Sequence, residues 1–62
     1  MEKKVIYKDL QGYKVTSQDN YNARIRDYRK IQNCKEFTSA NEIIEYYVKY
    51  CKCSENDFIV IE

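Results

Sequence analysis

The stretch that decides the fold is Ser39-Ala40-Asn41-Glu42-Ile43-Ile44-Glu45-Tyr46-Tyr47-Val48-Lys49-Tyr50-Cys51-Lys52. Ser39 and Glu42 have the spacing of a capping box, in which the serine oxygen accepts from the first helical turn and the glutamate reaches back. Behind this cap, apolar or small side chains recur at helical spacing, at Ala40, Ile43, Ile44, Tyr47, Val48 and Cys51. The pattern predicts an amphipathic helix over residues 39–52 with one buried face.

A second apolar run, Phe58-Ile59-Val60-Ile61, predicts a C-terminal strand after the helix. Successive strand side chains point to opposite faces, so this strand is apolar on both. One helix covers one face only, and residues 5–7 near the N-terminus pose the same problem. A second copy of the chain is the simplest cover for a domain this short of core, so we predict a homodimer.

The N-terminal part reads as a hairpin, with strands over residues 3–8 and 13–17 and the chain's single glycine, Gly12, at the turn. Residues 21–36 fit two templates. The one we favour is a strand over residues 21–26, a turn over residues 27–30 and a short strand within residues 31–37. The other is an amphipathic helix capped by Ser17 or Asp19.

Together these segments predict one α+β domain over residues 1–62, a small antiparallel sheet of three to five strands packed on the helix near residues 39–52. A chain of 62 residues buries about 60% of its unfolded surface. Its core is therefore marginal, which is the second reason to expect self-association.

The reactive side chains exclude several classes of protein. The chain has no histidine and three cysteines, Cys34, Cys51 and Cys53, too few for a four-ligand zinc site. With no apolar run for export or membrane insertion, we expect a cytoplasmic protein with reduced thiols, and neither metal nor cofactor. Without histidine or a glycine-rich phosphate loop, we predict no enzymatic activity.

Charge is divided unevenly along the chain. Residues 1–35 carry nine Lys or Arg against four Asp or Glu, and residues 36–62 carry two against six. A basic and aromatic segment within residues 24–35 could follow a phosphate backbone and stack on bases, with the candidate binding residues Arg24, Arg26, Tyr28, Arg29 and Lys30. The same charges also suit protection of a sheet edge and attraction between the unlike halves of two copies.

Two resemblances add to this reading. The richness in Lys, Glu, Asn, Ile and Tyr resembles that of small proteins of AT-rich Firmicutes and of their phages and prophages. Residues 21–27, Cys34 and residues 39–45 are similar in order to the HicB antitoxin core, which implies toxin neutralisation. The chain departs from that family because it lacks the proline and glycine turn before the cysteine and an appended DNA-binding segment.

The sequence therefore predicts a small bacterial or phage interaction protein, a homodimer that binds another protein. The alternative is a nucleic-acid-binding or antitoxin-like regulator that uses the basic segment. The candidate residues for the dimer or partner interface are Ile6, Tyr46, Tyr50, Ile59 and Ile61.

Overall fold

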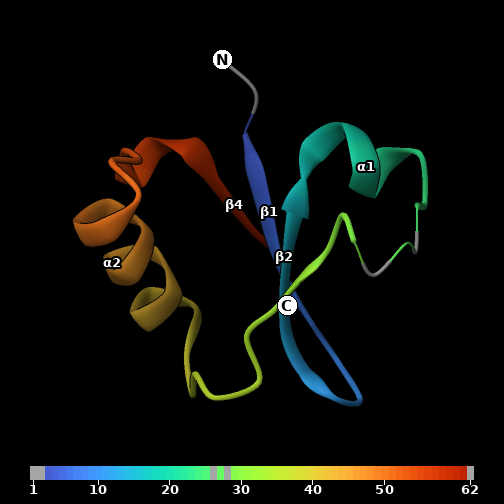
Figure 1. Cartoon of the computed structure of the whole chain (residues 1–62), viewed down its shortest axis with the longest axis horizontal. Helices are drawn as coiled ribbons and strands as arrows, with labels where there is room; N and C mark the ends of the chain where they lie inside the picture. Colours follow the sequence, from blue (N-terminus) through green and yellow to red (C-terminus); the bar gives the residue numbers. More distant parts are fainter. Residues whose placement is uncertain (1–2, 26, 28, 62) are drawn as a thin grey trace.

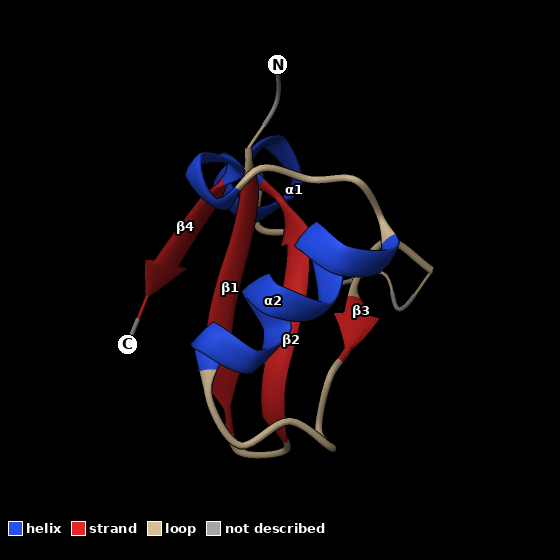
Figure 2. Ribbon diagram, turned by 90° about the vertical axis from the view of Figure 1, so that its left-hand side faces the viewer, coloured by secondary structure: helices blue, strands red, loops and turns tan. Residues whose placement is uncertain are grey.

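The computed structural model describes residues 3–25, 27 and 29–61. In chain order the elements are β1 (Lys4–Asp9), β2 (Gly12–Ser17), α1 (Gln18–Asn22), β3 (Gln32–Asn33), α2 (Ala40–Tyr50), the 3-10 turn η1 (Glu55–Asp57) and β4 (Phe58–Ile61). Within the described residues the strands form a four-stranded sheet in the order β3-β2-β1-β4 (Figures 1 and 2). The α+β class is confirmed.

The hairpin forms as predicted. β1 and β2 pair antiparallel in a register that sets Asp9 opposite Gly12, so two residues make the loop. Gly12 has φ +114°, and a Cβ there would lie 3.3 Å from the Cα of Lys35. Both the backbone angle and the close approach of the later segment require glycine at this position.

The orientation of β4 differs from the prediction. β4 pairs parallel to β1, with Val5 opposite Ile59 and Ile6 opposite Val60, so the sheet is mixed and not antiparallel. β3 is antiparallel to β2 and so runs in the direction of β1. α2 then carries the chain back across one face of the sheet (Figure 2). A strand that follows such a helical crossover starts again at the same end of the sheet, which makes β4 parallel to β1.

The strand predicted over residues 21–26 is wrong for residues 21–25, where the capped helix is the better template. Residue 26 lies outside the described residues. α1 spans Gln18–Asn22, and the Ser17 hydroxyl oxygen accepts from the Asn20 amide at 3.1 Å. The helix ends within two turns because Arg24 takes a left-handed conformation with φ 57°. The predicted short strand within residues 31–37 is present as β3, two residues long.

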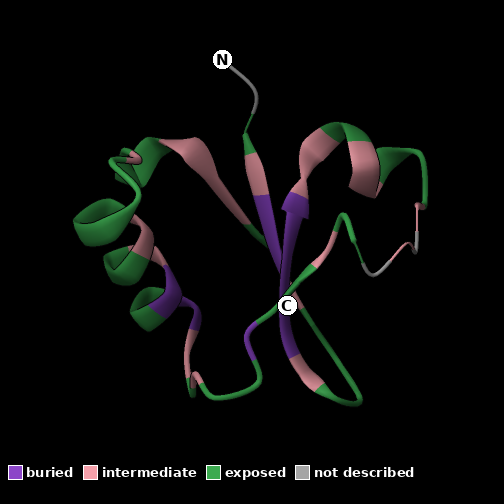
Figure 3. Cartoon of the chain, viewed as in Figure 1, coloured by how far each residue is buried: buried purple, intermediate pink, exposed green. Residues whose placement is uncertain are grey.

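One face of the sheet packs on α2 and forms the core. Ile6 and Val15 lie opposite each other in the hairpin and are buried with Ile43 of the helix. Ser39 caps α2 by accepting from the Glu42 amide, as the sequence predicts. Figure 3 shows the buried residues concentrated where the central strands meet this helix. The sequence analysis placed Val48 on the buried face of the helix, but its side chain is 38% exposed. The buried positions of α2 are Ala40 and Ile43, near its start.

The opposite face of the sheet is covered from within the chain. α1 and the segment that follows it lie on the side away from α2 (Figure 1). The Tyr21 ring lies 5.4 Å from the Tyr7 ring, and the Thr16 hydroxyl donates to the Lys30 carbonyl at 3.0 Å. Val5, which alternates away from the core side, is 1% exposed. The premise that this face needs a second copy is therefore wrong for β1 and β2, because residues 18–25 and 29–31 cover it.

Truncation of Ile43 tests the core. Ile43 is fully buried, so Ile43→Ala should lower the free energy of unfolding by about 2–5 kcal/mol. Val48→Ala on the same helix should cost less than about 1 kcal/mol. Urea unfolding followed by circular dichroism measures both, with Ile43→Val as a milder variant should the alanine form not fold. Equal losses for Ile43→Ala and Val48→Ala would contradict the packing described.

Candidate binding surfaces

The first surface is the outer edge of β4, called here the β4 edge and made of residues 58–61. Among the described residues, no strand pairs with β4 on the side away from β1. Val60 is 41% exposed and Ile61 37%, while Phe58 and Ile59 are half-buried. The run contains no charged side chain, proline or glycine. Such an edge offers free backbone donors and acceptors beside apolar side chains, which favours pairing with another strand.

The second surface lies along α2 and is called the tyrosine flank, made of Phe37, Tyr46 and Tyr50. The Tyr46 ring lies 5.6 Å from that of Phe37 and 5.0 Å from that of Tyr50. Tyr46 is 46% exposed and Tyr50 63%. The structure thus brings these two predicted interface residues together on one surface.

Aromatic contacts link the tyrosine flank to β4 through the half-buried Tyr47. The Tyr47 ring lies 5.8 Å from that of Tyr46 and 5.7 Å from that of Phe58. Burial, the largest cause, raises the pKa of Tyr47 to about 12, and Cys34 adds to the shift. Tyr47 is therefore a neutral packing residue between the two surfaces.

Ile6 was predicted at the interface together with these residues, but the structure places it elsewhere. Its side chain is fully buried beneath α2. The reason is the alternation of β1, which turns Ile6 toward the helix and Val5 toward the other face. Ile6 thus contributes to the core and to no exposed surface, whereas Ile59 and Ile61 lie on the β4 edge.

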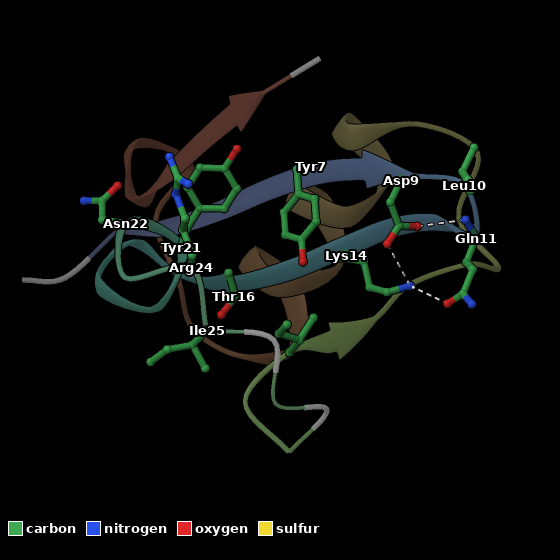
Figure 4. A pocket seen from close by; sticks show the side chains of 11 residues that line it. Tyr7, Asp9, Leu10, Gln11, Lys14, Thr16, Tyr21, Asn22, Arg24 and Ile25 are labelled. Atoms are coloured by element: carbon green, nitrogen blue, oxygen red, sulfur yellow. Dashed lines mark hydrogen bonds and ion pairs between the residues drawn. The ribbon is translucent and has the colours of Figure 1, made fainter.

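The third surface is a hollow of about 840 Å³ on the face away from α2. Figure 4 shows Tyr21 and Arg24 at one end of this hollow, Tyr7 in the middle, and Lys14 with Asp9 at the other end. Tyr7 and Tyr21 are half-buried and their rings contact each other, so each presents only part of its surface to the hollow. The hollow combines aromatic surface with two cationic side chains.

Lys14 is a buried cation that the sequence analysis missed. The residue is 5% exposed, and its ammonium lies 3.5 Å from an Asp9 carboxylate oxygen and 3.3 Å from the Gln11 side-chain oxygen. Strand alternation places Lys14 opposite the core side, where a solvent-exposed position is the usual expectation. The Asp9 and Gln11 side chains of the hairpin hold its ammonium, and no strand or helix spacing in the sequence predicts these contacts.

The basic segment is not gathered into one surface. Arg24 reaches the hollow, but Arg29 forms a two-point contact with Asp27, at 3.0 and 3.2 Å. Hydrogen bonds from Arg29 hold the pKa of Asp27 below its ordinary value. Lys30 is exposed, while its carbonyl accepts from Thr16. Arg26 and Tyr28 lie outside the described residues.

The cysteines are unpaired, with Cys34 in the core, Cys51 exposed and Cys53 half-buried. Burial, helped by the nearby Glu36 charge, raises the pKa of the Cys34 thiol and so lowers its reactivity. Within the described part of the chain, no cluster of three or more potential metal ligands occurs. In the same part, no helix has the length and apolarity needed to cross a membrane.

Comparison with protein-family models, with curated proteins and with solved structures yields no match to this chain. The functional argument therefore rests on the three surfaces alone.

The ion pair between the buried Lys14 ammonium and the exposed Asp9 carboxylate gives a prediction about the hollow. The Gln11 backbone amide donates a hydrogen bond to the Asp9 carboxylate at 2.8 Å. Asp9→Asn keeps an oxygen that can accept this bond but removes the charge opposite Lys14. We expect the free energy of unfolding to fall by about 1 kcal/mol, because a buried ammonium loses its counter-ion. Asp27→Asn removes an ion pair whose Arg29 side chain is 90% exposed and should change stability less. Chemical denaturation of both variants measures the difference, and a larger loss for Asp27→Asn would contradict the assignment.

Proposed function

We propose that this chain is a non-enzymatic interaction protein that forms a homodimer through the β4 edge and binds a protein partner with its tyrosine flank. The observation that carries the proposal is an uncharged apolar strand at the edge of the sheet, with Val60 41% exposed. Such edges are normally shortened, charged or covered, because they otherwise recruit another strand.

The two edges of the sheet differ in a way that supports this choice. β3 is two residues long and polar, Gln32–Asn33, and Lys35 follows it closely. This edge has the usual protection against pairing. β4 has four apolar residues and no such protection. With both faces of the central strands covered internally, the β4 edge is the apolar surface that self-association would bury.

The tyrosine flank supports a protein partner. Interfaces are enriched in tyrosine, because its ring supplies apolar contact area while its hydroxyl keeps a hydrogen bond to partner or water. Tyr46 and Tyr50 are exposed and their rings support each other at 5.0 Å. The Lys49 ammonium lies 5.3 Å from the Tyr50 ring centre and adds a positive charge at the rim.

A charge placed on the β4 edge should abolish the dimer. Light scattering on the wild-type protein, with reductant present, should give twice the chain mass over a dilution series at low and moderate salt. Val60→Lys should give the monomer mass, because an edge lysine would have to lose water on pairing.

The matched control for this experiment is Val48→Lys. Val48 is 38% exposed, a fraction similar to that of Val60, but it lies on α2 and not on the β4 edge. This variant should remain dimeric. A monomeric wild-type protein, or loss of the dimer in Val48→Lys alone, would overturn the proposed dimer.

A second candidate function is single-stranded nucleic-acid binding in the hollow. It is favoured by the contact of Tyr7 with Tyr21 beside the exposed Arg24. Aromatic rings stack on bases, and a neighbouring cation attracts the phosphate. The total charge of +1 offers little long-range attraction, so we expect weak binding that depends on this local arrangement.

Fluorescence anisotropy with a labelled oligothymidylate tests the second candidate. Arg24→Asn removes the cation and retains a residue that tolerates the φ of 57° found there. If the hollow binds the strand, this variant should weaken binding several-fold and reduce its salt dependence. Arg29→Asn is the control, since Arg29 already pairs with Asp27. No binding at low salt, or equal effects of the two substitutions, would exclude the hollow as the site.

A further inference from the structure

We infer that the two copies join by antiparallel pairing of β4 with β4 about a two-fold axis perpendicular to the sheet, giving one continuous sheet with both α2 helices on the same face. This inference rests on the proposed dimer and adds its geometry. It follows from two features of β4, which are its edge position and the alternation of its side chains.

The edge position fixes the direction of pairing. A closed dimer of identical chains has a two-fold axis, and each copy presents the same surface to the other. When an edge strand meets its own copy across such an axis within one sheet, the axis reverses the strand direction. The two β4 strands are therefore antiparallel, although β4 is parallel to β1 inside each copy.

The alternation restricts the register. Phe58 and Val60 share the face that packs on α2, because their β1 partners are Lys4 and Ile6, whereas Ile59 and Ile61 share the other face. In a continuous sheet, residues directly opposite each other lie on the same face. Even-numbered residues must then face even-numbered ones, and a slip of one residue would oppose unlike faces.

Two registers satisfy this condition with extensive overlap. In the first, Ile59 lies on the two-fold axis opposite its own copy, and Phe58 faces Val60 of the other chain. In the second, Val60 lies on the axis and Ile59 faces Ile61. Both registers set Val60 opposite an apolar residue of the other chain. The second does the same for Ile61, which faces Asp57 in the first.

Cysteine cross-linking at the axis tests the geometry. In a background with Cys51→Ser and Cys53→Ser, and with Cys34 left buried, either Ile59→Cys or Val60→Cys should form a disulfide-linked dimer on mild oxidation. Opposed residues in antiparallel strands have Cα atoms about 4.5–5.5 Å apart, within the disulfide range of about 4.4–6.8 Å. Light scattering under reducing conditions and circular dichroism confirm that each variant is folded and dimeric before oxidation.

Ile61→Cys in the same background is the matched control. In both registers the two copies of position 61 are at least two residues out of line, about 7 Å apart along the strand. Ile61→Cys should therefore cross-link far less than whichever of Ile59→Cys and Val60→Cys lies on the axis. A reduced dimer in which neither Ile59→Cys nor Val60→Cys cross-links would overturn this geometry and leave the proposed dimer standing. Preferential cross-linking between Ile59→Cys and Val60→Cys chains in a mixture would overturn it as well, because such a register opposes unlike faces. Reduced variants and wild type that are all monomeric would overturn the inference together with the proposed function.

Discussion

The structure depends on covering both faces of a small sheet with the residues of one short chain. α2 covers one face and buries Ile6 and Ile43 completely. Residues 18–25 and 29–31 cover the other, through the ring contact of Tyr21 with Tyr7 and the hydrogen bond from Thr16 to the Lys30 carbonyl. The cover is centred on β1 and β2. The apolar surface that remains at β4 follows from this limited supply of covering residues, since small domains bury a small fraction of their surface.

The two faces consequently differ in character. The face under α2 is closed by apolar side chains, whereas the opposite face contains the buried ammonium of Lys14 with Asp9 and the neighbouring hollow. The Asp9 side chain of this ion pair is 41% exposed, so the pair adds little stability compared with apolar packing. This division separates the β4 edge and the tyrosine flank, which suit protein contacts, from the polar hollow.

Local patterns were enough to predict the elements whose signals are contained in a few residues. The cap at Ser39, the spacing of Ile43 and Tyr47, and the turn at Gly12 predicted α2 and the hairpin. The direction of β4 could not be read from Phe58–Ile61, because strand alternation is the same in both directions. The burial of Ile6 and of Lys14 depends on contacts with other segments, which a local pattern does not contain. Residues 18–22 form a helix because Ser17 caps it, although the residues from Tyr21 onward fit a strand pattern equally well. Helical spacing predicted the exposed positions of Tyr46 and Tyr50, and strand alternation placed Ile59 and Ile61 on the same face of β4.

The position of β4 beside β1 also has a consequence for the order of folding. β1 obtains one neighbour from the adjacent hairpin, but its other neighbour comes from residues 58–61, more than fifty positions later in the chain. The hairpin is a local contact that forms rapidly, whereas the closure of so long a loop must precede the pairing of β1 with β4. During synthesis, the apolar edge of β1 therefore stays open to other chains until the last strand has been made.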